Sequence, residues 1–316
     1  MVNLRKGSPS AKNRFKNFLF EINFVKLKPH NKLHLRFLMS KFIYKLYEIL
    51  PKNLVNGIGK SSLLKPVRDR YLRSDKGFKS IEVRVSRDYL DYHVEFKFNA
   101  SIKTAEKAGN RGIENTLLRN SIRLISKKTE MNNPVLFDIG ANFGYLSLVW
   151  ANTICKKGII YSFEPNPSVY DCFRKSVSVN HLEKIIKHHN FAVGRESGTA
   201  EFHFAETSSN IISDINSNSN ISIKIISVDD FAEENKIDRC DMIKIDVDGI
   251  EYEILNGAAK TIDKFKPLLI IETNEDQKIL DFIFDKHYNI FDMKLNKVNP
   301  GDEIPANIFC VFGDSN

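Results

Sequence analysis

Two patterns of hydrophobic and polar positions alternate along residues 134–316. Short apolar runs are separated by segments in which apolar residues recur every three or four positions. The runs predict buried strands and the periodic segments predict amphipathic helices. We expect strands at 135–137, 159–163, 185–192, 242–245, 268–271 and 308–312, and helices at 143–155, 167–179, 251–262 and 277–284. This order indicates an α/β fold with helices on both faces of a mainly parallel sheet.

Other segments have different patterns. Strict alternation over residues 80–100 predicts a two-stranded hairpin, and residues 113–127 predict a helix. A small hairpin is expected around Gly198, with residues 199–204 as one arm. The Ser/Asn-rich stretch 206–224 predicts a loop, either a tolerated insertion or a lid over a substrate pocket.

The front of the chain is basic and leucine-rich. Apolar spacing over residues 33–50 predicts an amphipathic helix that ends at Pro51. The 316 residues carry a net charge of +8, but residues 1–80 hold 19 Lys/Arg against 4 Asp/Glu, which leaves the remainder at −7. We therefore expect a basic N-terminal extension (1–110), containing the amphipathic helix and the hairpin, and a second domain (111–316).

The positive charge of the N-terminal extension affects which binding partners and which cellular location we expect. Residues 1–75 could contact an anionic membrane surface, although a helix packed on the second domain with solvated lysines is favoured. No nucleic-acid partner is expected, because the rest of the chain is acidic. The sequence has no membrane-length apolar run, no secretory h-region and no C-x-x-C pair. These features predict a cytoplasmic protein, with peripheral membrane contact as the alternative, whose four cysteines are buried thiols. The oligomeric state is left open.

The first predicted strand of the second domain ends in an acidic, glycine-containing loop. Asp138 is followed by Gly140 and Gly144, which allow a tight turn and close approach of a ligand. The loop is neither the G-x-G-x-x-G of nicotinamide enzymes nor a Walker loop, since no G-K-[ST] follows. Asp138 would repel a pyrophosphate but attract an ammonium group. S-adenosylmethionine has an ammonium group and no phosphate.

A second carboxylate follows the next strand. Glu164 lies 26 residues after Asp138 and can accept hydrogen bonds from both hydroxyls of a ribose. Alone, Glu164 would be interpreted as a carboxylate at a helix N-terminus, because Pro167 can open the next helix. Together with the glycine loop at the same sheet edge, the ribose role is favoured.

Acidic residues crowd the ends of two later strands. Asp246, Asp248 and Glu251 follow the strand at 242–245, and Glu272 follows the strand at 268–271. Like charges this close should raise at least one pKa or require a cation. Glu251 could instead be a first-turn carboxylate of the next helix. Asp246, Glu272 and Asn274 could hold Mg²⁺, but metal dependence is the less favoured interpretation.

These residues resemble the FkbM family of S-adenosylmethionine-dependent methyltransferases, over about residues 113–312. The most specific block is Ile245-Asp-Val-Asp-Gly249. The family usually has Glu at the position of Asp248, so the chain has a shorter carboxylate there. The other matching blocks are Phe137–Tyr145, Phe163–Pro167, Asn190–Gly194, Ser227–Phe231, Leu255–Ala258 and Lys266–Glu272.

The resemblance implies a class I methyltransferase fold for residues 111–316, with an antiparallel last strand. It implies O-methylation of a hydroxyl on a sugar, glycan, glycolipid or secondary metabolite. Asp138, Gly140, Asn142 and Gly144 would hold the methionine part of the cofactor, Glu164 the ribose, and Asn190 to Ala192 the adenine. Tyr145 and Asn166, in the same blocks, complete the expected cofactor set.

A hydroxyl nucleophile must lose its proton during methyl transfer. Asp246, Asp248 and Glu272 are the candidate catalytic residues, with Asp246 preferred. Two other functions are weighed. Asp246-x-Asp248 could be the metal site of a glycosyltransferase, which leaves the glycine loop unexplained. The fold could also serve a non-catalytic protein that binds membranes or another anionic partner. Binding of S-adenosylmethionine would favour the methyltransferase.

Overall fold

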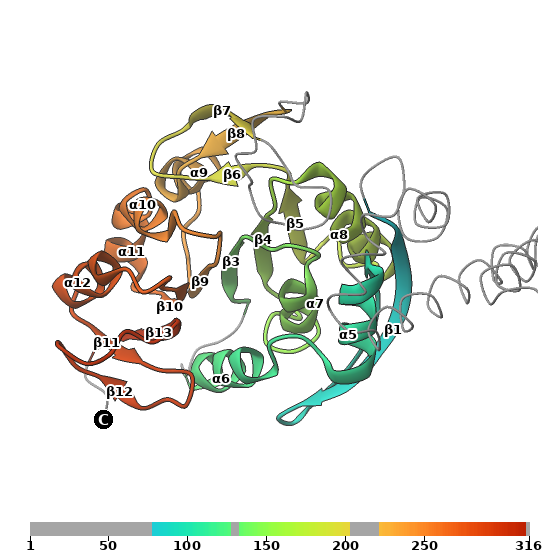
Figure 1. Cartoon of the computed structure of the whole chain (residues 1–316), viewed down its shortest axis with the longest axis horizontal. Coiled ribbons are helices and arrows are strands. Elements are labelled where there is room, and N and C mark those ends of the chain that lie inside the picture. The colour runs from blue at the N-terminus through green and yellow to red at the C-terminus, as the bar shows by residue number, and fades with distance from the viewer. Residues whose placement is uncertain (1–77, 128–132, 203–220, 314–316) are drawn as a thin grey trace, which may run out of the picture. The chain divides into compact units, whose positions relative to one another are not determined.

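The computed structural model describes residues 78–127, 133–202 and 221–313, and its centre is an eight-stranded sheet (Figure 1). The strand order is β12-β11-β13-β10-β9-β3-β4-β5. Strands β5, β4, β3, β9 and β10 are mutually parallel, whereas β13 is antiparallel to β10. This order confirms the predicted class I methyltransferase fold. The strands are β3 (Val135–Ile139), β4 (Ile159–Phe163), β5 (Ile186–His189), β9 (Met242–Ile245), β10 (Leu268–Glu272), β11 (Tyr288–Phe291), β12 (Lys297–Val298) and β13 (Asn307–Phe312).

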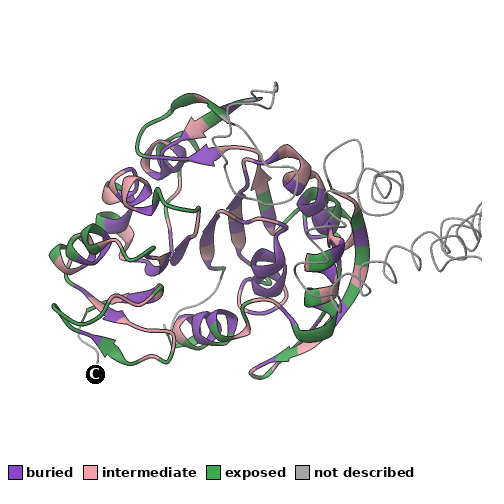
Figure 2. Ribbon diagram, viewed as in Figure 1, coloured by how far each residue is buried: buried purple, intermediate pink, exposed green. Residues whose placement is uncertain are grey.

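Helices cover both faces of this sheet (Figure 1). Alternate residues of β3, β9 and β10 belong to a buried apolar cluster with α9 (Val228–Glu234), α10 (Glu251–Asn256), α11 (Ala259–Phe265) and α12 (Gln277–Asp285). The other face is covered by α6 (Asn115–Ser126), α7 (Tyr145–Ala151) and α8 (Pro167–Val179). Burial on both faces explains why the central strands are apolar runs without polar alternation (Figure 2).

The predicted hairpin is confirmed as β1 (Ser80–Tyr89) and β2 (Tyr92–Ser101), followed by α5 (Ile102–Arg111). It packs on α7 and α8. The amide of Asn99 donates to Ser176 Oγ at 2.8 Å, and the ring of Phe98 lies edge-on to Tyr145 at 5.3 Å. The division of the chain after residue 110 stays a prediction.

Three predicted segments differ from the structure in their bounds or in their strand pairing. The strand at 185–192 is two strands, β5 and β6 (Ala192–Val193). The arm near Gly198, β7 (Gly198–Phe202), pairs with β8 (Ile221–Ile226) and so forms no local hairpin. The helix at 251–262 is divided into α10 and α11 near Gly257, where a Cβ atom would lie 2.4 Å from the carbonyl oxygen of Gly194.

Some predictions concern residues outside the described ranges. The amphipathic helix at 33–50 lies entirely outside them, and the 206–224 loop mostly so, with its last four residues in β8. The four cysteines are buried thiols, as predicted. Within the described ranges, no helix combines the length and apolar character that a bilayer span would need.

Candidate functional site

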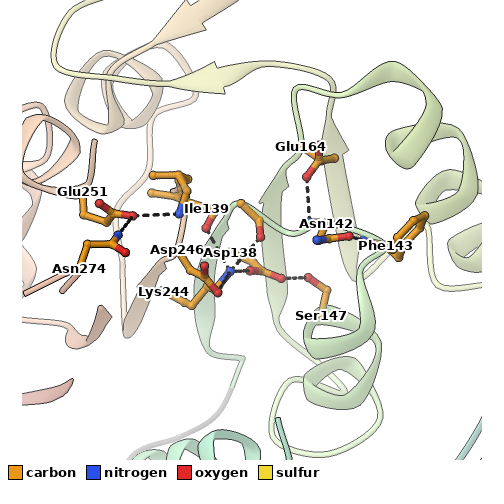
Figure 3. Close-up of polar contacts among 12 residues, drawn as sticks. Asp138, Ile139, Asn142, Phe143, Ser147, Glu164, Lys244, Asp246, Glu251 and Asn274 are labelled. Carbon is orange, nitrogen blue, oxygen red and sulfur yellow. Dashed lines mark hydrogen bonds and ion pairs between the residues drawn. The ribbon is translucent and has the colours of Figure 1, made fainter. Parts of the chain in front are cut away.

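The candidate site lies where β3, β4, β9 and β10 end (Figure 3). Parallel strands bring these ends to one edge of the sheet, where ligands of open α/β sheets bind. The predicted polar residues of four separate segments are therefore brought together. The site has three parts: the glycine loop (residues 140–144), the carboxylate of Glu164, and an acidic group around Lys244.

The glycine loop is held tightly between two strand ends. The amides of Gly140 and Ala141 donate to the carbonyl of Phe163 at 3.1 and 2.9 Å. Gly140 has φ +75°, and a Cβ atom there would lie 1.9 Å from the carbonyl oxygen of Asp246. The loop therefore packs against the backbone at the end of β9, and only glycine fits at residue 140.

Glu164 is buried at the end of β4 and braces this loop. One carboxylate oxygen accepts the amide of Asn142 at 2.9 Å, and the other accepts the amide of Asn166 at 2.8 Å. Burial raises the pKa of Glu164 to about 7, although these two hydrogen bonds favour the charged form. Both carboxylate oxygens are thus bonded within the chain, and the carboxyl changes charge near neutral pH. The ribose role stays a prediction.

Asp138 is completely buried at the end of β3 and is bound within the chain. Its Oδ2 accepts a hydrogen bond from Ser147 at 2.5 Å, and its Oδ1, which has no hydrogen-bond partner, lies 3.6 Å from Lys244 Nζ. Burial raises the pKa of Asp138, against the pull of Lys244. The expectation that Asp138 attracts the ammonium of a cofactor needs correction, because the ammonium that it faces belongs to Lys244.

Lys244 is the centre of the acidic group, and its side chain is only 4% exposed. Its Nζ donates to the carbonyls of Gly140 at 2.8 Å and Ile139 at 3.3 Å, and lies 3.3 Å from Asp246 Oδ2. Burial disfavours the ammonium, but the surrounding carboxylates outweigh it and hold the pKa of Lys244 above its usual range. The lysine is therefore charged at any pH at which the protein works.

The sequence analysis missed Lys244, although a signal was present. It is the one polar residue of Met-Ile-Lys-Ile, a strand otherwise suited to complete burial. A lysine in such a strand needs a carboxylate partner. Asp138 is its register partner on β3, so both side chains lie on the same face. The crowded carboxylates required a cation, and the chain itself provides it.

Asp246 and Glu272 share a hydrogen bond, and their pKa values are shifted in opposite directions. Burial alone would raise the pKa of Asp246, but Lys244 and the hydrogen bond from Glu272 hold it below its usual range. Burial and the adjacent Asp246 charge raise the pKa of Glu272 to about 7. Near neutral pH Glu272 is therefore about half protonated, whereas Asp246 stays ionised. The predicted raised pKa is confirmed at this residue.

Glu251 stabilises the backbone of the site through hydrogen bonds. Its buried carboxylate accepts the amides of Val247 and Gly249 and the side-chain amide of Asn274, at 3.0–3.2 Å. This bonding fixes the turn that carries Asp248, which is exposed and has φ +62°. Among the described residues, no group of three or more His, Cys, Asp or Glu side chains is arranged to hold a metal ion.

A further carboxylate, Glu114, joins the acidic group and was not predicted. It precedes α6 and has φ +47°. Glu114 is exposed, but desolvation by the surrounding chain raises its pKa, Lys244 lowers it and Asp246 raises it, so its charge lies close to theirs. Its side chain makes no capping hydrogen bond to α6.

Four residues predicted to bind the cofactor make other contacts. The hydroxyl of Tyr145 pairs with that of Tyr89 at 3.0 Å in the hairpin interface, so its side chain is a packing residue. Asn166 caps α8 by accepting backbone amides of the first turn. Asn190 donates to two carbonyls after β4, at 2.8 and 2.9 Å, and thus joins the ends of β4 and β5. Ala192 is buried in β6. Contact of Asn190 and Ala192 with adenine stays a prediction.

Comparison with protein families gives a match over most of this site. Residues 138–292 match the family described as the Methyltransferase FkbM domain. A curated relative is the hexuronic acid methyltransferase AglP of Haloferax volcanii, which is 24% identical over 149 residues. That alignment covers 47% of this chain and 59% of the relative, so the chain spans less than two thirds of the relative's length.

Solved structures also resemble the chain at low identity. The methyltransferase FkbM of Methylobacillus flagellatus KT is 17% identical, with a TM-score of 0.40, over 56% of this chain and 43% of that one. The precorrin-6y C5,15-methyltransferase of Geobacter metallireducens GS-15 is 14% identical, with a TM-score of 0.36, over 62% of this chain and 89% of that one.

Proposed function

This chain carries a methyltransferase FkbM domain, and we propose that it transfers the methyl group of S-adenosylmethionine to a hydroxyl of a sugar-containing acceptor. The observation that carries the proposal is the set of strand ends, where a glycine loop, the carboxylate of Glu164 and the Asp246–Glu272 pair share one sheet edge. The name of the AglP relative supports a sugar as the acceptor class.

The residues present fit S-adenosylmethionine. Gly140 and Gly144 have φ +75° and +80° and no room for a Cβ atom, so the loop turns tightly at the sheet edge where ligands of such folds bind, which suits the methionine part. Glu164 offers a carboxylate for the two ribose hydroxyls. The excess of carboxylates over Lys244 favours a positively charged ligand. When bound, S-adenosylmethionine supplies a methyl group already activated on a sulfonium centre.

The Asp246–Glu272 pair fits the role of proton acceptor. A base works best when its pKa lies near the working pH, and that of Glu272 is about 7. With Glu272 ionised, the pair can accept the hydroxyl proton as the acceptor oxygen forms its bond to the methyl carbon. Asp246 remains charged beside Lys244 and orients the pair. Positioning supplies much of the remaining acceleration.

The charge of the site favours a hydroxyl over a carboxylate as the acceptor. Hexuronic acids offer both groups. A carboxylate acceptor would enter a group that contains Asp246, Asp248, Glu272 and Glu114, with Lys244 as the neighbouring buried cation. Like-charge repulsion opposes that approach, whereas a neutral hydroxyl can donate to these oxygens. The expected product is therefore a methyl ether.

Labelled S-adenosylmethionine and a panel of neutral and acidic glycosides would test the proposal. We expect label in a product that survives mild alkali, as an ether does and an ester does not. Asp246→Asn and Glu272→Gln should abolish transfer and leave S-adenosylhomocysteine binding intact. Glu275→Gln, an exposed carboxylate nearby, is the matched control and should retain activity. An alkali-labile product, or full activity of Asp246→Asn, would overturn this assignment.

The same protein separates the alternatives. A glycosyltransferase or a non-catalytic protein on this fold has no need to bind S-adenosylhomocysteine. Calorimetry should show binding by the wild type, and loss of binding in Glu164→Ala with the fold retained. Absence of binding by the folded wild type would reject the methyltransferase.

A further inference from the structure

We propose that Lys244 is a positioning residue that couples the glycine loop to the acidic pair through one buried ammonium group. The inference rests on the proposed function and assigns a role to a residue outside the expected cofactor and catalytic sets. Its Nζ contacts the carbonyls of Ile139 and Gly140 at the end of β3 and the carboxylate of Asp246, which directly follows β9 (Figure 3).

The geometry makes these contacts mutually dependent. The Gly140 carbonyl belongs to the turn that opens the glycine loop, and Asp246 is the first residue after β9. Both are in contact with the same nitrogen, at 2.8 and 3.3 Å. A shift of the loop would therefore move the ammonium, and a shift of the ammonium would release Asp246. The cofactor part and the acceptor part of the site are joined at this atom.

The charge of Lys244 matters more than its volume. Asp138 is completely buried, and its Oδ1 has no hydrogen bond and lies 3.6 Å from the ammonium. Without the positive charge, the carboxylates of Asp138 and Asp246 would lie close together with no compensation. A methionine at this position would preserve the packing and remove the charge, which separates the two contributions.

The test compares Lys244→Met with Arg239→Met. Arg239 pairs with Asp241 at 2.7 Å before the opposite end of β9, so it controls for the loss of an ion pair at the far end of the strand. In Lys244→Met we expect S-adenosylhomocysteine affinity to fall about 10- to 100-fold, because hydrogen bonds to a charged donor that hold the loop are lost. The turnover number should fall further, since Asp246 is released. Arg239→Met should leave both values within about threefold.

Two measurements separate positioning from general stability. Ethylammonium added to Lys244→Ala should restore turnover in a saturable manner, which neutral ethanol of similar size should not do. In the double variant Lys244→Met/Asp246→Asn, the loss in S-adenosylhomocysteine affinity should equal that of Lys244→Met alone, because Asp246→Asn leaves this binding intact. Unchanged affinity and turnover in a folded Lys244→Met protein would overturn the proposal.

The outcome does not depend on finding the acceptor. If no acceptor is methylated, the proposed function fails, but the affinity of Lys244→Met still tests the coupling of the loop. If Lys244→Met does not fold, a crystal structure of the wild type with S-adenosylhomocysteine decides. Nζ within hydrogen-bond distance of both Gly140 O and an Asp246 carboxylate oxygen supports the proposal, and separation from either contradicts it.

Discussion

Replacing Gly140 by alanine should destabilise the protein for two separable reasons. The residue has φ +75°, where a Cβ atom costs about 1–2 kcal/mol. The new Cβ atom would also lie 1.9 Å from the carbonyl oxygen of Asp246. That contact is with backbone, so the ends of β3 and β9 must separate, which adds about 1–3 kcal/mol of overpacking strain. The expected loss in the free energy of unfolding is about 2–5 kcal/mol.

Two glycines provide matched controls. Gly301 has φ +91°, but a Cβ atom added there would have no neighbour within 4 Å, so Gly301→Ala should cost only the backbone part, about 1–2 kcal/mol. Gly198 has open space without a positive φ, and Gly198→Ala should change stability by less than about 0.5 kcal/mol. Urea denaturation followed by circular dichroism gives all three values. Equal losses for Gly140→Ala and Gly301→Ala would refute the close packing of the glycine loop on β9.

Three further outcomes are expected. Affinity for S-adenosylhomocysteine should increase about tenfold between pH 6 and pH 8 as Glu164, with a pKa of about 7, ionises and can accept the ribose hydroxyls; a pH-independent affinity measured by calorimetry would contradict this role. Tyr145→Phe should lower the free energy of unfolding by about 1 kcal/mol and leave that affinity unchanged; a tenfold weaker affinity would instead make Tyr145 a ligand contact. Glu251→Ala should cost about 1–3 kcal/mol in urea denaturation, because three part-buried donors lose their acceptor; a loss below about 0.5 kcal/mol would show that the turn holds without it.

Elements with strong local signals could be predicted from the sequence. The bounds 159–163, 167–179 and 242–245 agree with the structure, because apolar runs and the Asn166–Pro167 helix start determine them locally. The pairing of β7 with β8 could not be predicted, since the two strands are separated by 18 residues and only tertiary contacts select the partner. The same limit applies to the break at Gly257, which depends on the close approach of Gly194.

In the candidate site, too, some features could be predicted from the sequence and others depended on tertiary contacts. Strand-end position was enough to place Glu164, Asp246 and Glu272 at one sheet edge. Motif position was not enough to assign contacts, because Tyr145 faces the hairpin and Asn166 caps its helix. The sequence indicated that the acidic group would raise a pKa or require a cation, but it did not identify that cation. Lys244 supplies it, since the register between β3 and β9 brings a lysine beside a buried carboxylate.

The central claim is that this sheet edge binds S-adenosylmethionine and methylates a sugar hydroxyl. The most direct test is transfer of a labelled methyl group from S-adenosylmethionine to a glycoside, with wild type and Glu272→Gln compared from about pH 5.5 to about pH 8.5. The account predicts an alkali-stable methyl ether, a wild-type rate that rises with pH through about 7, and no transfer by Glu272→Gln. Transfer by Glu272→Gln at the wild-type rate, or a rate that falls as the pH rises through about 7, would contradict it.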